Sequence, residues 1–123
     1  MILCVDDEPI GLRVRKLMLE HAGYEVLTAS SGLEGLSVFS QESVRAVVLD
    51  YAMPEMNGGE VAAEMKRRKP EIPILMLSAY VDLPDDALQF VDARSVKGES
   101  PVALLSELER LLFDNKCSAQ RST

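Results

Sequence analysis

The sequence predicts an α/β protein of five (βα) units, in which a doubly wound, five-stranded parallel sheet carries helices on both faces. Short apolar runs alternate with segments of helical periodicity along the 123 residues. Residue types that begin and end helices flank those segments, and acidic side chains directly follow two of the apolar runs. Because consecutive parallel strands need a helical crossover, this alternation indicates a parallel sheet covered by helices.

Five apolar runs are predicted to be buried strands. Continuous apolar sequence, rather than strict alternation, is typical of strands in a sheet that is covered on both faces. Four runs are strong and the last is weak. They cover residues 2–5, 24–29, 46–49, 72–77 and 93–96.

Helical spacing of apolar residues fills the intervals between these strands. The segment at 83–91 has room for only about two helical turns, whereas each of the other helices has a set of apolar residues on one face. These sets are Ile10, Val14, Leu17 and Met18; Leu33, Leu36 and Phe39; Val61, Ala62 and Met65; and Leu104, Leu105, Leu108, Leu111 and Leu112.

The helix boundaries coincide with residues whose conformational preferences suit them. These residues are Pro9 in a first turn, Gly23 at a helix end, Ser30 or Ser31 as an N-cap, Pro70 after a helix, and Ser100 as an N-cap followed by Pro101. We assign residues 1–113 to a single domain and predict a polar, flexible tail at 114–123.

Composition narrows the classes of function. The net charge of −7 repels phosphate backbones, so we expect no direct binding to nucleic acid. The basic run at 66–69 fits the last turn of a helix, where cations are favoured. No apolar run reaches the roughly 18 residues of a membrane span, and the N-terminus lacks the basic region of a signal peptide. We therefore expect a cytoplasmic protein, with Cys4 and Cys117 as free thiols.

Polar and charged residues follow four predicted strands: Asp6 and Asp7 the first, Asp50 the third, Ser78 the fourth and Lys97 the fifth. In an open parallel sheet these positions share one rim, where ligands bind. Each alone has a structural explanation, such as a helix cap at Asp7, but the shared rim favours a site. Clustered carboxylates indicate Mg²⁺ or Mn²⁺ rather than zinc. An aspartate beside such a cation can attack phosphorus and form an acyl phosphate.

Four motifs built on these residues resemble the response-regulator receiver family of two-component signalling. They are VDDEP at 5–9, LDYAMPEMNG at 49–58, LSA at 77–79 and VK at 96–97. The resemblance extends from residue 2 to about residue 112 and implies a receiver domain with the flavodoxin-like strand order 2-1-3-4-5. It also implies that a sensor histidine kinase or a histidine phosphotransfer protein supplies the phosphoryl group.

The resemblance implies roles for the acidic residues. Asp50 would be the phosphoacceptor. Asp7, Asp50 and the backbone carbonyl of Ala52 would hold Mg²⁺, and Asp6 would act mainly through a bound water.

The resemblance also implies how the signal is read. Ser78 would bind a phosphoryl oxygen, and Lys97 would pair with Asp50. A conformational change would then reach the surface formed by the fourth helix, the fifth strand and the last helix. That surface would bind an unknown downstream protein or a second copy of the chain.

The sequence departs from the family pattern near the lysine. The interval from the serine to Lys97 is 19 positions, a few fewer than usual, and Gly98 stands where the family has proline. Arg94 replaces an aromatic switch residue. It is either a surface arginine paired with Asp82 or Asp92, or a residue that senses phosphorylation or contacts a partner directly.

Two positions bear on phosphate lifetime and on alternative functions. Ala52 offers no hydrogen bond to attacking water and Tyr80 adds bulk, so we expect slow self-dephosphorylation. A phosphatase would need a second carboxylate at position 52, so we expect a signalling domain rather than a turnover enzyme. The remaining alternative is a degenerate receiver that binds partners without phosphorylation.

Overall fold

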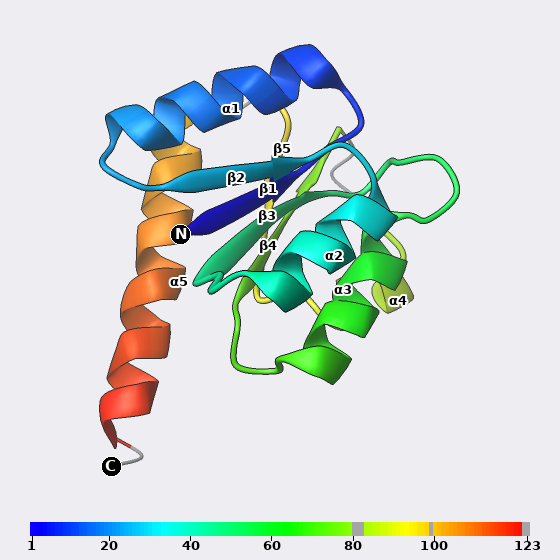
Figure 1. Cartoon of the computed structure of the whole chain (residues 1–123). Helices are drawn as coiled ribbons and strands as arrows, with labels where there is room; N and C mark the ends of the chain where they lie inside the picture. Colours follow the sequence, from blue (N-terminus) through cyan, green and yellow to red (C-terminus); the bar gives the residue numbers. More distant parts are fainter. Residues whose placement is uncertain (80–82, 99, 122–123) are drawn as a thin grey trace.

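The computed structural model describes residues 1–79, 83–98 and 100–121, with side chains as far as Phe113. Strands and helices alternate along the chain (Figure 1). In order they are β1 (Ile2–Val5), α1 (Pro9–His21), β2 (Val26–Ala29), α2 (Gly32–Gln41), β3 (Ala46–Asp50), α3 (Gly58–Arg68), β4 (Ile74–Ser78), α4 (Asp85–Leu88), β5 (Ala93–Val96) and α5 (Pro101–Arg121).

The five strands form one parallel sheet in the order β2-β1-β3-β4-β5, which confirms the predicted fold class and strand order. The runs predicted at 24–29 and 72–77 begin two residues earlier than β2 and β4. Strands β3 and β4 each continue by one polar residue, Asp50 and Ser78. The hydrogen-bonded sheet therefore extends as far as these two residues of the predicted site.

Helices cover both faces of the sheet (Figure 1). Leucines of α1 and α5 pack on one face, against side chains of β1, β3 and β4. Side chains of α2 and α3, including Phe39 and Met65, pack on the other face against the alternate residues of the same strands. A covered parallel sheet needs apolar side chains on both sides of each strand, which explains the continuous apolar runs in the sequence.

Local capping explains where the helices begin. The Ser31 hydroxyl accepts the Glu34 N–H at 3.1 Å, so Ser31 is the cap of α2. Asn57 and Glu60 form a reciprocal capping box at the start of α3. Pro9 is the first residue of α1, where the Glu8 carboxylate, not the Asp7 carboxylate, accepts the Gly11 N–H. Asp7 is thus left available to the site.

The face predicted for α1 is wrong for three of its four residues, since only Met18 of the four packs against the core. Leu12 and Leu19 are buried against the sheet, whereas Ile10, Val14 and Leu17 are 74%, 58% and 56% exposed. The two sets lie on opposite sides of the helix, and both have helical spacing, so apolar periodicity did not distinguish them. Among the described residues of α1, three apolar side chains therefore form an exposed stripe.

The other helical faces agree more closely with the prediction. Those of α3 and α5 are buried or partly buried as expected, but Leu33 at the start of α2 is exposed. Helix α4 is a single turn of four residues, shorter than the two turns predicted. The backbone of α5 continues to Arg121, so it is helical where the sequence predicted a polar tail. The flexibility of residues 114–123 stays a prediction.

No helix in the part of the chain that the structure describes combines the length and apolar character needed to cross a membrane.

Candidate functional site

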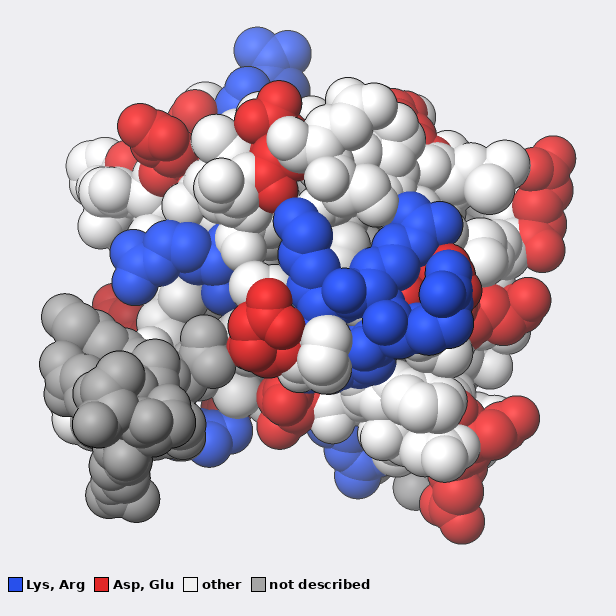
Figure 2. Space-filling view, turned by 60° about the horizontal axis from the view of Figure 1, so that its bottom comes forward, with Lys and Arg blue, Asp and Glu red and all other residues white. Residues whose placement is uncertain are grey.

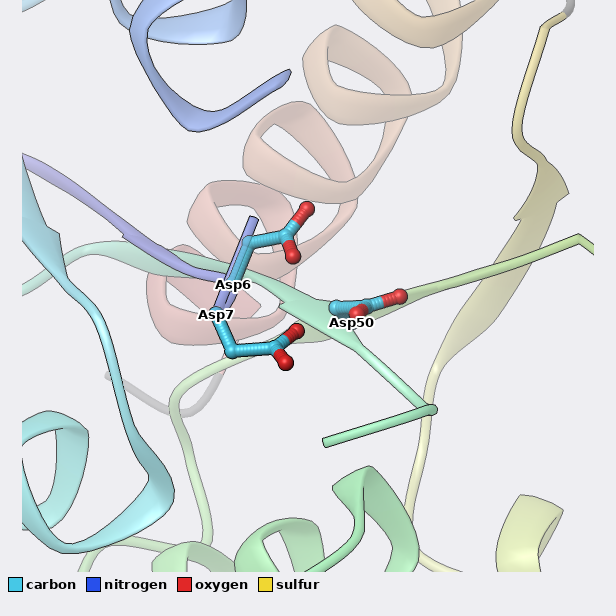
Figure 3. A group of neighbouring side chains, drawn as sticks. All are labelled: Asp6, Asp7 and Asp50. Carbon is cyan, nitrogen blue, oxygen red and sulfur yellow. The ribbon is translucent and has the colours of Figure 1, made fainter. Parts of the chain in front are cut away.

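The ends of two neighbouring strands position the three carboxylates. Strands β1 and β3 pair with Val5 opposite Leu49, so Asp6, which follows β1, comes beside Asp50 at the end of β3. Asp7 is next along the chain, and Figure 3 shows the three carboxylates gathered at this edge of the sheet. One oxygen from each of the three lies within 4.8 Å of the others.

Burial makes this cluster unfavourable without cations. Asp6 is 1% exposed and Asp50 is 2% exposed, whereas Asp7 is exposed to solvent. Two buried like charges at this separation repel each other and lose hydration, so their ionised forms need positive charge nearby.

Lys97 supplies one positive charge. Its Nζ lies 2.9 Å from Asp50 Oδ1 and 3.3 Å from Asp6 Oδ2. The Lys97 backbone N–H donates to the Ser78 carbonyl at 2.7 Å, which continues the β4–β5 pairing past the end of β5. The sheet thus holds the backbone of this lysine, and the side chain reaches across to β1 and β3.

Arg15 supplies a second positive charge that the sequence reasoning missed. Its Nη2 pairs with Asp6 Oδ2, while Asp6 Oδ1 accepts the Glu8 N–H at 3.0 Å. Arg15 belongs to the buried face of α1, three residues after Leu12 and four before Leu19. The sequence could have indicated this contact, because an arginine among the buried residues of a helix needs a charged partner close by.

The two buried carboxyls have opposite pKa shifts. Burial and the nearby Asp6 charge raise the pKa of Asp50 to about 6, although Lys97 opposes the rise. Burial also acts to raise the pKa of Asp6. The Glu8 N–H and the charges of Arg15 and Lys97 outweigh it, so the Asp6 pKa lies below its ordinary value. The pKa of Lys97 is raised by its two carboxylate partners against the opposing effect of burial.

The remaining predicted residues, Ser78 and Ala52, lie at the end of the neighbouring strand and in the loop that follows Asp50. Ser78 is the buried last residue of β4. Ala52 lies two residues after Asp50 and is exposed to solvent. Pro54 lies in the same loop, and this loop returns to begin α3 at Gly58, whose N–H donates to the Tyr51 carbonyl at 2.8 Å.

Arg94 is the second residue of β5, and Gly98 lies two residues after its end. Arg94 pairs in register with Met76 and is exposed. Asp92, one expected partner of Arg94, binds Lys66 at 2.7 Å, and the other, Asp82, lies outside the described residues together with Tyr80. Gly98 has a φ of 92°, which proline cannot adopt, so the backbone seen here could not accommodate the proline of the family pattern.

A family model described as response regulator receiver domain matches residues 2–97. The chain belongs to the response regulator receiver domain family. The curated relatives of this receiver domain include the transcriptional regulatory protein GlrR of Escherichia coli, which is 42% identical over 84 residues. That match covers 68% of the chain but only 19% of the relative, so the chain spans about a fifth of GlrR.

Solved structures of receiver domains superimpose closely on this one. A CheY-like receiver domain protein from Methanospirillum hungatei has a TM-score of 0.89 and 28% identity, and the match covers 95% of this chain and 96% of that one. The response regulator protein TrrA from Thermotoga maritima, solved in complex with Mg²⁺ and BeF, has a TM-score of 0.85 and 35% identity. It matches 89% of this chain and 96% of its own.

Proposed function

We propose that the domain accepts a phosphoryl group on Asp50 and transmits its phosphorylation state to another protein. The buried Asp50 carboxylate, 2.9 Å from Lys97 Nζ and next to two further carboxylates, is the observation that carries this proposal. The donor is a sensor histidine kinase or a histidine phosphotransfer protein. Membership of the receiver family supports this class of donor.

The donor set fits a hard divalent cation. Three carboxylate oxygens lie within 4.8 Å of one another, and Mg²⁺ prefers one or two carboxylates together with water and phosphate oxygens. We propose that Asp7, Asp50 and the Ala52 carbonyl hold Mg²⁺ or Mn²⁺, with Asp6 acting mainly through water. The cation would offset the negative charge of the incoming phosphoryl group. The relative TrrA was solved with Mg²⁺.

The residues of the chain then perform an in-line transfer. An oxygen of ionised Asp50 attacks phosphorus, the P–N bond of the donor phosphohistidine breaks, and the imidazole nitrogen takes up a proton. Lys97 pairs with the phosphoryl oxygens and Ser78 donates a hydrogen bond to one of them. Asp50 is regenerated only by hydrolysis or by a further transfer, so we propose a switch rather than a turnover enzyme.

The exposed stripe of α1 supports a protein donor. Ile10, Val14 and Leu17 lie on the helix that follows Asp6 and Asp7 directly. Exposed apolar side chains next to a functional site are typical of an interaction surface. A helical donor packed on this stripe would bring its phosphohistidine to Asp50.

We propose that phosphorylation changes the surface formed by α4, β5 and α5. That surface would bind an unknown downstream protein or a second copy of the domain. The short α4 and Arg94 make that surface unusual for the family. Arg94→Ala should change phosphorylation kinetics or partner affinity, and a variant that changes neither would assign Arg94 to the surface alone.

We also propose that the chain is cytoplasmic and does not itself bind nucleic acid. Both statements are about this chain alone, because the transcriptional regulators it resembles are much longer.

The test is intact mass spectrometry after incubation with acetyl phosphate and Mg²⁺. We expect the mass of one phosphoryl group to be added, and Asp50→Asn to abolish the addition. Asp86→Asn, which changes an exposed carboxylate on α4, is the matched control and should keep it. A chain that gains no phosphoryl group would instead be the degenerate receiver, which binds partners without phosphorylation.

A further inference from the structure

Arg15 occupies a position that an apolar residue would normally fill. It lies in the same stripe of α1 as the buried Leu12 and Leu19, and its side chain is only 14% exposed. A guanidinium is always charged, so its burial is tolerated only with a charged or strongly polar partner. Asp6 is that partner.

The sequence leaves room for this contact. Helical side chains point toward the N-terminus of their helix, so Arg15 extends back past Gly11 toward Asp6. A Cβ added at Gly11 would lie 2.6 Å from Glu8 Oε2 and 3.4 Å from Arg15 Nη1. A larger side chain at position 11 would therefore compete with the guanidinium for the same space.

Both oxygens of Asp6 already have partners within the chain. Oδ1 accepts the Glu8 N–H, and Oδ2 is shared by Arg15 and Lys97. A cation or cation-bound water that binds Oδ2 of Asp6 would compete with Arg15 for that oxygen. The guanidinium charge also repels any cation held by the same carboxylates, and this repulsion is strong where the charges are buried.

We propose that Arg15 competes with the divalent cation for Asp6 and thereby sets the Mg²⁺ concentration at which Asp50 can be phosphorylated. This inference rests on the proposed function, because it assumes that the three carboxylates hold the cation. Arg15 acts through Asp6 and is a positioning residue.

The experiment is isothermal titration of the unphosphorylated full chain with MgCl₂. Arg15→Leu replaces the guanidinium by an apolar side chain that suits the buried stripe, and we expect Mg²⁺ to bind about tenfold more tightly. Arg15→Lys keeps the charge and should lie closer to wild type. Arg13→Leu removes an exposed charge from the same helix and should change the affinity by no more than about twofold.

A double-mutant cycle tests the route through Asp6. In an Asp6→Asn background, Arg15→Leu should no longer tighten Mg²⁺ binding by the same factor, because the shared partner has lost its charge. In the single variant Arg15→Leu, half-maximal phosphorylation by acetyl phosphate should need less Mg²⁺ than in wild type. Thermal unfolding by circular dichroism checks the fold, and Arg15→Met, which is unbranched, replaces Arg15→Leu if that variant does not fold.

Two results would overturn the inference in different ways. Equal or weaker Mg²⁺ binding in both Arg15→Leu and Arg15→Met, with wild type binding normally, would refute the competition and leave the proposed function intact. No Mg²⁺ binding by any variant, wild type included, would refute the metal site and the inference with it.

Discussion

At the scale of single residues, Asp6 and Asp50 show how neighbours decide the charge of a buried carboxyl. Both are almost fully buried, but Asp6 accepts the Glu8 N–H and pairs with Arg15 and Lys97, whereas Asp50 pairs with Lys97 and lies beside the Asp6 carboxylate, which disfavours its charge. The Asp50 pKa is therefore raised and the Asp6 pKa lowered. The proposed phosphoacceptor is the less stabilised of the two carboxylates, which suits a group that must react.

The raised pKa predicts that Asp50→Asn stabilises the metal-free domain at neutral pH. In the folded chain the Asp50 pKa is about 6, against an ordinary value of 3.8. The folded state thus binds more protons between these values, and stability is lost as pH rises through them. Removing the carboxylate should raise the free energy of unfolding by about 1–3 kcal/mol above pH 6.

Urea unfolding in the presence of a chelator, followed by circular dichroism at several pH values, measures this difference. The gain should vanish below the ordinary pKa of aspartate, where Asp50 is protonated in both states. Asp7→Asn changes an exposed carboxylate in the same cluster and should have a smaller effect. A pH-independent gain in Asp50→Asn would rule out the protonation argument.

Ala52 predicts a long-lived aspartyl phosphate. Its methyl group offers no hydrogen bond to a water that attacks phosphorus, and it is exposed at the site. Ala52→Asn should shorten the lifetime several-fold, because an amide can orient that water. The decay of the phosphorylated mass after removal of acetyl phosphate gives the lifetime. Loss of phosphate within seconds from the wild-type chain would contradict the prediction, and Glu55→Gln in the same loop is the control.

At the scale of elements, the loop from β3 to α3 depends on a close backbone contact. A Cβ at Gly58 would lie 2.6 Å from the Asp50 carbonyl oxygen and 2.8 Å from Tyr51 Cα. These are backbone atoms of the segment that carries Asp50, so they cannot move aside without shifting the loop. Glu55 in the same loop has a φ of 69°, which adds conformational strain.

Gly58→Ala is therefore expected to destabilise the domain by about 1–3 kcal/mol, although alanine favours helices more than glycine does. Denaturant unfolding measures the change. Gly98→Ala provides a comparison, since a Cβ there meets nothing within 4 Å and only the φ of 92° opposes it. A stabilising effect of Gly58→Ala would show that the loop adjusts freely.

Most elements could be predicted from sequence because local preferences and tertiary packing agree in them. The strands were found from continuous apolar runs, and Ser31, Ser100 and Pro101 mark helix starts as expected. The face of α1 could not be found this way. Its buried stripe contains a charged residue, Arg15, whose partner Asp6 lies outside the helix, directly after β1, and the opposite stripe is the more apolar one.

The sequence predicted which strand ends form the site, but not the contact of Arg15 with Asp6. The rim shared by strand ends placed the carboxylates and Lys97 together, because parallel strands align their carboxyl ends. The Arg15 contact depends on side-chain packing across α1 and the end of β1, which strand order alone does not specify. The short α4 was anticipated from the small number of residues between β4 and β5.

At the scale of the whole molecule, positive charge is unevenly spread, and much of the basic run at 66–69 is hydrogen bonded within the chain. Figure 2 shows lysines and arginines gathered on the side where α3 ends. In the basic run at 66–69, Lys69 Nζ donates to the Phe39 carbonyl at 2.8 Å and Arg68 Nη1 to Ser40 Oγ at 2.7 Å. These bonds tie the end of α2 to the end of α3, so the run has a structural role.

We therefore expect the chain to bind duplex DNA no more tightly than the weakest nonspecific complexes at about 0.15 M salt. The net charge of −7 opposes binding, and the basic run is already hydrogen bonded within the domain. Fluorescence anisotropy of labelled duplex DNA measures it. Micromolar affinity that falls steeply with salt, and is lost in Lys69→Gln, would show that the basic run binds phosphates after all.

The single turn of α4 has a consequence for the dynamics of the domain. No side-chain hydrogen bond caps its start at Pro84, and the Ala87 N–H reaches only the Pro84 carbonyl, at 3.0 Å. Opening such a turn exposes little apolar surface, so its amide protons should exchange with solvent far faster than those of β1 and β3. If phosphorylation or a partner orders this turn, the event will be visible as slowed deuterium uptake at α4.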